Sequence, residues 1–159
     1  MKHKLQRARS LSTGDWGILA EAWLTLSWID FVVSFLPYRW WKSWLGTPRD
    51  TGSDTAPGSS HDINRLVRLL DAAANHHPRK PTCLRRSLGL KRLLGRRGIA
   101  SVLRIGVNKD NTKINAHAWV ECGGIVINDA PAVASQYALL PVLTEELLQR
   151  IEGPSVESV

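Results

Sequence analysis

The segment from Pro81 to Asp129 most strongly constrains the fold, because it places one strong helix signal before several strand signals. Pro81 breaks any helix that precedes it, and Thr82 is a residue type that caps helix N-termini. We therefore expect a helix from Cys83 to about Arg97. Gly98 then stands at the position after a helix that tolerates a left-handed residue.

Strand signals follow this helix. Ile99–Val107 has strand-like composition, the polar run Asn108–Lys113 predicts a turn, and two further strands are expected over Asn115–Cys122 and Ile125–Asp129. The last two strands should form a hairpin closed around Gly123-Gly124.

The N-terminal half predicts helices separated by a loop. Asp15 is expected to cap a helix over Trp16–Leu36 that ends at Pro37, and a short second helix is expected over Tyr38–Leu45. Residues 47–60 contain almost nothing that can be buried and predict a linker or loop. An amphipathic helix over Asp62–Asn75 and a final helix from Thr144 complete the prediction. The expected organisation is an N-terminal helical segment over 1–46, the linker over 47–60, and the main domain over 61–159.

The net charge of +7 is concentrated in one block. Between Arg79 and Arg104 there are nine Lys or Arg residues and no acid, whereas the rest of the chain holds 12 bases and 14 acids. Such a block attracts acidic peptide, phosphate or an anionic surface.

The stretch Trp16–Leu36 is the one membrane candidate, at 21 residues, but it contains Glu21 and Asp30, which are costly in lipid. We expect it to be buried against protein, with peripheral membrane contact as the less favoured alternative. Its length and its end do not fit a cleaved signal peptide. With only two cysteines, the chain is expected to be a cytoplasmic protein without a disulfide scaffold.

Cys83, His117 and Asp129 form a candidate catalytic set. The thiol lies where the positive end of a helix dipole, with Arg85 and Arg86 nearby, favours thiolate. Taken singly, each residue has an ordinary structural explanation. Cys83 could be a small core residue, His117 a half-buried strand residue, and Asp129 a turn residue at a strand end. Together they have the order of a nucleophile, a base and a base-orienting carboxylate.

Two hairpin registers are open. With a two-residue Gly123-Gly124 turn, His117 faces Ala130, and Asp129 points to the other face of the sheet because side chains alternate along a strand. With a three-residue loop that includes Cys122, His117 pairs with Asp129. The second register is predicted if Asp129 orients the imidazole. Trp119 and Glu121 share the face of His117 and either shape a substrate groove or cover it, whereas Cys122 is expected to serve packing.

The stretch Thr82–Asp129 resembles the transglutaminase-like cysteine protease domain that processes lasso-peptide precursors. The N-terminal run ending at Leu36–Trp41 is also similar to the helical lead-in of its stand-alone members. The resemblance is carried by Pro-Thr-Cys-Leu-Arg-Arg-Ser-Leu at 81–88, Arg-Gly-Ile at 97–99, Ile-Gly-Val at 105–107, Ala-His-Ala-Trp-Val-Glu at 116–121 and Asn-Asp at 128–129.

The resemblance implies an α+β, papain-like or transglutaminase-like fold with a nucleophile helix packed on a small antiparallel sheet. It implies a peptidase that removes the leader of a lasso-peptide precursor, with Cys83 as nucleophile, His117 as base and acid, and Asp129 as orienter. A separate leader-binding protein would be needed, since residues 1–60 lack the strands of a winged-helix module, and a separate cyclase would then close the macrolactam. No metal or cofactor is expected, because the cysteines and histidines lack paired ligand spacing.

Two other functions stay open from the sequence. A transglutaminase or acyltransferase would use the same three residues with an amine as acceptor. A non-enzymatic protein that binds nucleic acid or an anionic membrane through Arg79–Arg104 would show salt-dependent binding and leave Cys83 without a role. We favour the peptidase, and expect no nucleic-acid partner.

Overall fold

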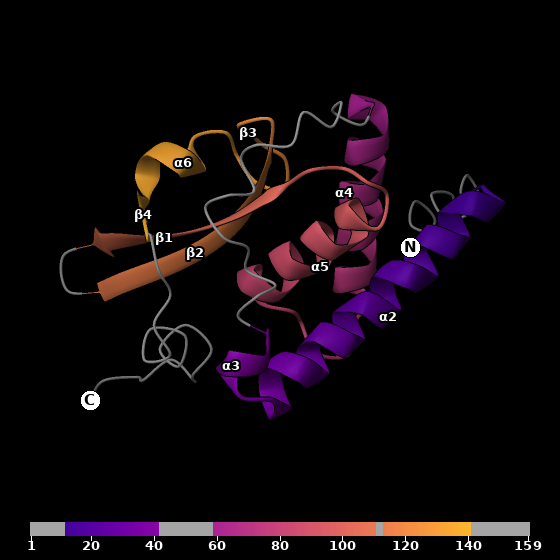
Figure 1. Ribbon diagram of the computed structural model, residues 1–159, viewed down its shortest axis with the longest axis horizontal. Helices are drawn as coiled ribbons and strands as arrows, with labels where there is room; N and C mark the ends of the chain where they lie inside the picture. The colour runs from indigo at the N-terminus through magenta and orange to yellow at the C-terminus, as the bar shows by residue number, and fades with distance from the viewer. Residues whose placement is uncertain (1–11, 42–58, 111–112, 141–159) are drawn as a thin grey trace, which may run out of the picture.

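The computed structural model describes residues 12–41, 59–110 and 113–140. Among the described elements, labelled in Figure 1, four helices come first, followed by three strands and then by one short helix and one short strand. They are α2 (Thr13–Phe35), α3 (Tyr38–Trp41), α4 (Ser60–Asn75), α5 (Cys83–Gly95), β1 (Val102–Asp110), β2 (Lys113–Cys122), β3 (Ile125–Val126), α6 (Val133–Gln136) and β4 (Ala138–Leu139). The expected α+β architecture is confirmed.

Helix α5 lies at the centre of the molecule, between the sheet and the pair formed by α2 and α4 (Figure 1). It contacts both of those helices on one side and strands β1 and β2 on the other. Four of its leucines are fully buried: Leu84, Leu90, Leu93 and Leu94. The helix that begins at Cys83 is therefore held from both sides, which fixes the position of its N-terminus.

The sheet has the strand order β3-β2-β1-β4, and each pair of neighbouring strands is antiparallel. Side chains alternate along β2, so that Ala118, Val120 and Cys122 face the helices and join the core. His117, Trp119 and Glu121 share the opposite face. The sheet thus has one core face and one face that carries the candidate base.

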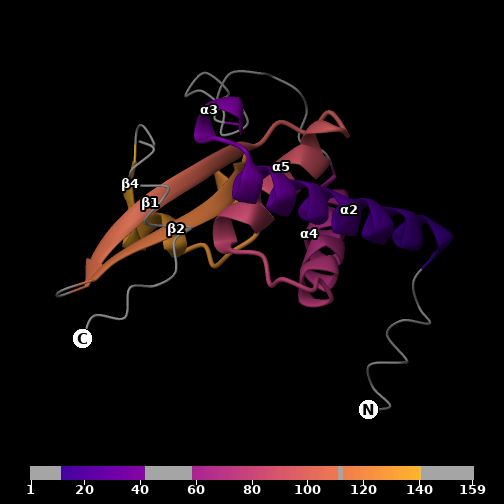
Figure 2. The same cartoon turned by 90° about the horizontal axis from the view of Figure 1, so that it is seen from below.

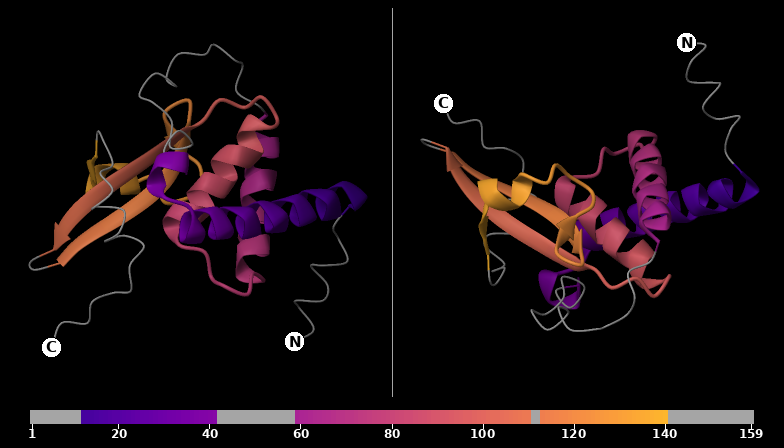
Figure 3. Two further views of the ribbon diagram at one scale, coloured as in Figure 1. Left: turned by 60° about the horizontal axis from the view of Figure 1, so that its bottom comes forward. Right: turned by 90° about the horizontal axis from the view of Figure 1, so that it is seen from above.

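The β1–β2 hairpin is longer than the sequence predicted. Asn108 pairs with Asn115 and Asp110 with Lys113, so most of the run expected to be a turn belongs to the strands. Figures 2 and 3 show this end of the hairpin extending beyond the helices. Strand pairing uses backbone groups, and a projecting ribbon has no core to cover, so a polar run is compatible with strand here.

Helix α2 begins earlier than predicted, and its cap is Ser12 instead of Asp15. The Ser12 hydroxyl accepts a hydrogen bond from the Asp15 N–H at 3.2 Å, and the Asp15 carboxylate accepts one from the Ser12 N–H at 2.8 Å. This reciprocal pair is a capping box. The hydrogen bond from the Ser12 N–H holds the pKa of Asp15 below its usual range. Hydrogen bonds from the Arg65 side chain, 2.6 Å away, and from the Ser12 hydroxyl lower it further.

One side of α2 is part of the core, as expected for a helix buried against protein. Ala22, Leu26, Ile29 and Val32 are almost completely buried against α4 and α5. Among the described helices α2 also has the length and apolar composition of a membrane span, with about a third of its most apolar window buried in the protein. Since α2 and α5 share one core, the N-terminal helix and the later helices fold as neighbours, and the proposed boundary at residues 46–61 stays a prediction.

The basic block is largely neutralised within the fold. Six of its nine basic residues form ion pairs with acids from α2, α4 or β2. The pairs are Arg79 and Arg85 with Asp30, Arg86 with Asp71, Arg96 and Arg97 with Glu21, and Arg104 with Glu121. Much of the positive charge that was expected to attract acidic peptide, phosphate or an anionic surface is therefore offset within the fold, where the pairs join helices and, at Arg104–Glu121, join β1 to β2.

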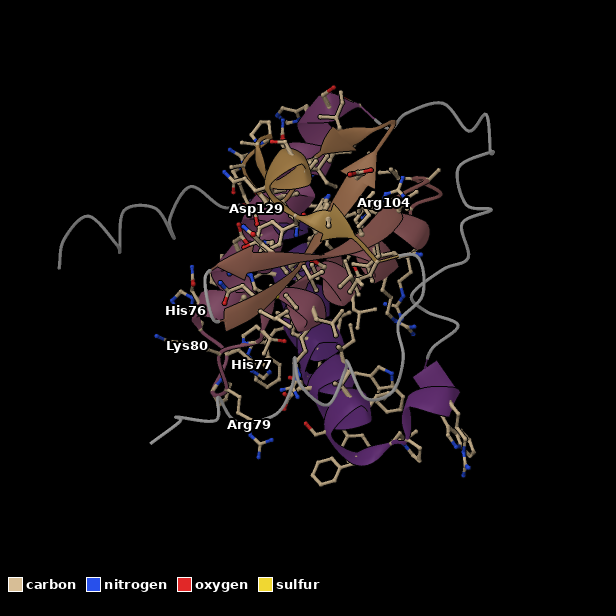
Figure 4. The ribbon with its side chains drawn as sticks, turned by 90° about the vertical axis from the view of Figure 1, so that its left-hand side faces the viewer. His76, His77, Arg79, Lys80, Arg104 and Asp129 are labelled. Carbon is tan, nitrogen blue, oxygen red and sulfur yellow. The ribbon has the colours of Figure 1, made fainter. Side chains whose placement is uncertain are left out.

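The loop between α4 and α5 is tied to α2 in the same way. His77 accepts or donates a hydrogen bond at 3.0 Å between its Nε2 and the Ser27 hydroxyl, and its ring lies 5.6 Å from that of Trp23. Arg79 reaches Asp30 at 3.5 Å. Figure 4 shows His76, His77, Arg79 and Lys80 on this loop, which leads directly to Cys83.

Two predicted boundaries are corrected. Helix α5 ends at Gly95 and not Arg97, although Gly98 is left-handed with φ of 69°, as expected after a helix end. Strand β3 ends at Val126 and not Asp129. Three predictions lie outside the described residues: the linker up to residue 58, the end of the second helix, and the final helix from Thr144. The described residues also form two short elements that were not predicted, α6 and β4.

Candidate active site

Cys83 is the first residue of α5, as predicted. Thr82 caps the helix, since its hydroxyl accepts a hydrogen bond from the Arg85 N–H at 3.4 Å and its carbonyl accepts one from the Arg86 N–H at 3.0 Å. The Cys83 side chain is half-buried and packs against the hydrophobic core. The thiol thus lies at the positive end of the helix dipole.

The arginines beside Cys83 contribute less positive field than the sequence suggested. The Arg85 guanidinium contacts Asp30, and the side chains of both are mostly buried, while Arg86 contacts Asp71. At the position of Cys83, the carboxylate of each pair offsets much of the positive field of its guanidinium. The positive field at Cys83 therefore comes mainly from the helix N-terminus.

His117 and Asp129 are joined by a hydrogen bond, with 2.6 Å between Nε2 of the ring and Oδ2 of the carboxylate. Burial raises the pKa of Asp129, but hydrogen bonds from His117 and from the Ala130 N–H, with the charges of His117 and Arg86, outweigh it and lower the pKa below its usual range. An ionised carboxylate only accepts hydrogen bonds, so Nε2 carries the proton. In the neutral ring, Nδ1 is then free to accept a proton.

The His117–Asp129 pair forms with a two-residue turn, the register in which Asp129 was expected to point away from His117. Cys122 pairs with Ile125 and Glu121 with Val126, so the turn is Gly123-Gly124, and the predicted three-residue loop is wrong. Both glycines have positive φ, of 56° and 78°, as the commonest two-residue hairpin turn requires. The ladder ends at Val126 and the chain bends at 128–129, so Asp129 does not follow the strand alternation that would point it to the other face.

The described contacts connect the helix of Cys83 to the strand of His117. Ser87 lies one turn after Cys83 on the same side of α5, and its hydroxyl donates to the Ala118 carbonyl at 3.0 Å. No hydrogen bond joins the Cys83 thiol to the His117 ring within the part of the chain that the structure describes. Such contacts are often long before substrate binds.

An aromatic cluster surrounds the imidazole. The His117 ring lies 6.4 Å from Trp119 and 5.4 Å from Tyr137 between ring centroids. Trp119 is fully buried, and its Nε1 donates to Glu121 at 2.9 Å. The other Glu121 oxygen accepts from Arg104 at 3.0 Å. Trp119 is therefore too buried to line an open groove, and Glu121 is held by two side-chain hydrogen bonds.

Gly106 and Tyr137 belong to the site and were not identified from the sequence. Gly106 lies opposite His117, and a Cβ at Gly106 would lie 2.7 Å from the Cβ of Tyr137 and 3.0 Å from the Trp119 ring. Only glycine lets Tyr137 approach so closely. A glycine inside a strand pattern was the available signal, since it often marks such an approach. Tyr137 carried no comparable signal.

Cys122 has the packing role that was predicted, since it is buried in the core and burial raises the pKa of its thiol. In Figure 4 Asp129 and Arg104 lie near the sheet, apart from the loop that carries His77 and Arg79. No group of three or more His, Cys, Asp or Glu side chains suited to a metal ion is present among the described residues.

Comparison with known proteins agrees with this architecture. The family model for the transglutaminase-like superfamily matches residues 27–142. The microcin J25-processing protein McjB of Escherichia coli is 43% identical over 80 residues, which are 50% of this chain and 38% of that protein. The match thus covers well under half the length of this curated relative, and no solved structure matches the chain. Because the matched region runs from α2 through β4 and includes Cys83, His117 and Asp129, the chain belongs to the transglutaminase-like superfamily.

Proposed function

We propose that this chain is a cysteine peptidase that removes the leader from a ribosomally made lasso-peptide precursor. The observation that carries the proposal is the His117–Asp129 hydrogen bond on a strand packed against the helix that begins at Cys83. The similarity to a microcin-processing protein supports the substrate class. We infer that the reaction takes place in the cytoplasm, before a separate cyclase closes the ring.

The proposed chemistry assigns one role to each group. His117 Nδ1 takes the thiol proton, and the Cys83 thiolate attacks the scissile carbonyl while the Cys83 backbone N–H, at the positive end of α5, stabilises the oxyanion. The protonated ring gives its proton to the leaving amine, which leaves a thioester on Cys83. Water then attacks the thioester with His117 as base, releases the carboxylate and restores the thiol. Asp129 keeps the ring in the tautomer that begins this cycle.

We further propose that the outer face of α2 binds the separate leader-binding protein. This outer face, defined as Leu24, Trp28, Phe31 and Phe35, is exposed and has no charged residue. The three acids of α2 all point toward the protein, where arginines neutralise them. Exposed aromatic residues in a row are typical of interface anchors.

The function is tested with a precursor peptide encoded beside this gene, incubated with the chain and with the leader-binding protein. Mass spectrometry should detect the free leader carboxylate, and Cys83→Ala should release none. An amide-linked product formed with added amines, at the expense of the free acid, would instead support an acyltransferase. Absence of any turnover with wild-type protein and partner would contradict both enzymatic functions.

The docking surface is tested with the exposed double variant Trp28→Ala/Phe31→Ala. Cleavage without the partner should stay unchanged, while stimulation by the partner should fall on the order of tenfold or more, as for interface anchors. Ile114→Ala is a matched control, since Ile114 is equally exposed but lies on the projecting hairpin. Full stimulation of the double variant would overturn the partner proposal and leave the outer face without a role. A loss confined to binding of anionic lipid vesicles would overturn it in favour of a membrane contact.

A further inference from the structure

Asn128 occupies the point where β3 leaves β2, and its side chain replaces part of the backbone ladder. The Ile127 N–H donates to the Val120 carbonyl at 3.0 Å, as in a continuing antiparallel pair. The Val120 N–H, however, donates to Oδ1 of Asn128 at 2.7 Å, where the ladder would use the Ile127 carbonyl. The side-chain amide thus accepts the hydrogen bond of the Val120 N–H while the backbone bends away from β2.

The second half of the Asn128 amide connects the bend to the helix of Cys83. Its Nδ2 donates to the Ser87 hydroxyl at 3.1 Å, and that hydroxyl donates to the Ala118 carbonyl. Ser87 is completely buried, so these polar groups have little access to water and depend on one another. One asparagine side chain therefore joins β2, the segment after β3 and α5.

The consequence falls on Asp129, the next residue along the chain. If the ladder continued past Val126, the two-residue turn would place Ala118 opposite Asp129, on the core face of β2. The bend at Asn128 instead lets the carboxylate reach Nε2 of His117. The geometry of the proposed base and orienter is thus decided one residue before the orienter itself.

We propose that Asn128 is a positioning residue: its amide, seated on Val120 and Ser87, holds Asp129 against His117 and keeps this pair in register with the helix of Cys83. The proposal rests on the proposed peptidase function for its kinetic test only. Asn128 itself takes no part in bond making or proton transfer. Its effect passes through Asp129.

The kinetic test is a double-mutant cycle between Asn128→Ala and Asp129→Asn, measured on precursor cleavage with the leader-binding protein present. Asn128→Ala alone should lower kcat about 10- to 100-fold with KM nearly unchanged, since small misplacements of catalytic groups cost this much. In the Asp129→Asn background the same substitution should lower kcat less than about threefold, because the residue it positions is already absent. Asn64→Ala, an exposed asparagine of α4, is the matched control.

Equal losses in both backgrounds, or an unchanged kcat for Asn128→Ala, would overturn the proposal. Asn128→Asp retains an oxygen for the Val120 N–H, and the Ser87 hydroxyl can turn to donate to it, so this variant should be closer to wild type than Asn128→Ala. If Asn128→Ala does not fold, Ser87→Ala, which removes the partner of Nδ2, takes its place in the cycle.

A measurement without substrate separates this proposal from the proposed function. The ring nitrogens of His117 should show the Nε2–H tautomer by NMR in the wild type and in Asn64→Ala, and a mixture of tautomers in Asn128→Ala. An unchanged tautomer in a folded Asn128→Ala would overturn the positioning role. If wild-type protein cleaves no precursor but the tautomer shifts as expected, the peptidase function fails and the positioning role stands.

Discussion

Asp129 Oδ2 lies 2.6 Å from His117 Nε2, although the two-residue turn of their hairpin places these residues out of register with each other. The contact exists because the strand ends early and the chain bends back. A carboxylate held in this way orients the imidazole without occupying a position in the sheet. It also leaves Nδ1 as the ring nitrogen for proton exchange.

Cys83 should be essential and Cys122 dispensable for cleavage. Cys83→Ala should abolish release of the leader without loss of the fold, and iodoacetamide should alkylate Cys83 faster than Cys122, whose thiol is buried and has a raised pKa. Peptide mass mapping after timed alkylation checks the order. Equal labelling, or cleavage by Cys83→Ala at the wild-type rate, would contradict it, and Cys122→Ala serves as the matched variant.

Asp129→Asn should lower kcat by less than Cys83→Ala does, because Asp129 orients the base and breaks no bond. Its effect on stability should depend on pH. The folded pKa of Asp129 is below its ordinary value of 3.8, so its stabilising contribution is fully present above that value and is lost as the pH falls through the folded pKa. Denaturant unfolding of both proteins between pH 7 and pH 2 measures the difference, which should shrink toward the acid end. A difference that grows on acidification would refute this assignment.

Gly106→Ala should destabilise the protein by roughly 1–3 kcal/mol, as overpacked core positions do. The new Cβ would meet the Cβ of Tyr137 at 2.7 Å, and relief requires β4 and Tyr137 to move away from His117. Cleavage should therefore fall together with stability. Gly17→Ala, in α2 with no atom within 4 Å of the added methyl, should instead be neutral or stabilise by about 0.5–1 kcal/mol. Equal effects of the two variants on unfolding would contradict the close approach at Gly106.

Asp30→Ala should cost much more stability than Glu21→Ala. Asp30 and Arg85 have side chains only 13% and 14% exposed, and removing one partner of a buried pair costs about 3–5 kcal/mol. The partners of Glu21, Arg96 and Arg97, are more exposed, and such pairs contribute about 0–1 kcal/mol. Chemical denaturation compares the two variants directly. A smaller loss for Asp30→Ala than for Glu21→Ala would show that α2 does not depend on this buried pair.

Features governed by neighbouring residues were predictable from the sequence. Thr82 capping the helix of Cys83, left-handed Gly98, and the glycines of the β2–β3 turn all follow from backbone preferences that act over a few residues. The same is true of the amphipathic face of α4, because helical periodicity alone brings its apolar residues together.

Features that depend on partners far apart in the chain were decided by the tertiary structure alone. At the bend, the Asn128 amide donates to Ser87, 41 residues earlier, and the Arg85 guanidinium is paired with Asp30, 55 residues before it. Neither long-range partner is implied by the local pattern around these residues. The sequence by itself thus determined that a helix begins at Cys83 and that a hairpin turns at Gly123-Gly124. Tertiary packing decided that Asp129 reaches His117, that Arg85 pairs with Asp30, and that the Tyr137 ring lies beside His117. Each depends on side chains that meet only when the helices and the sheet have packed together.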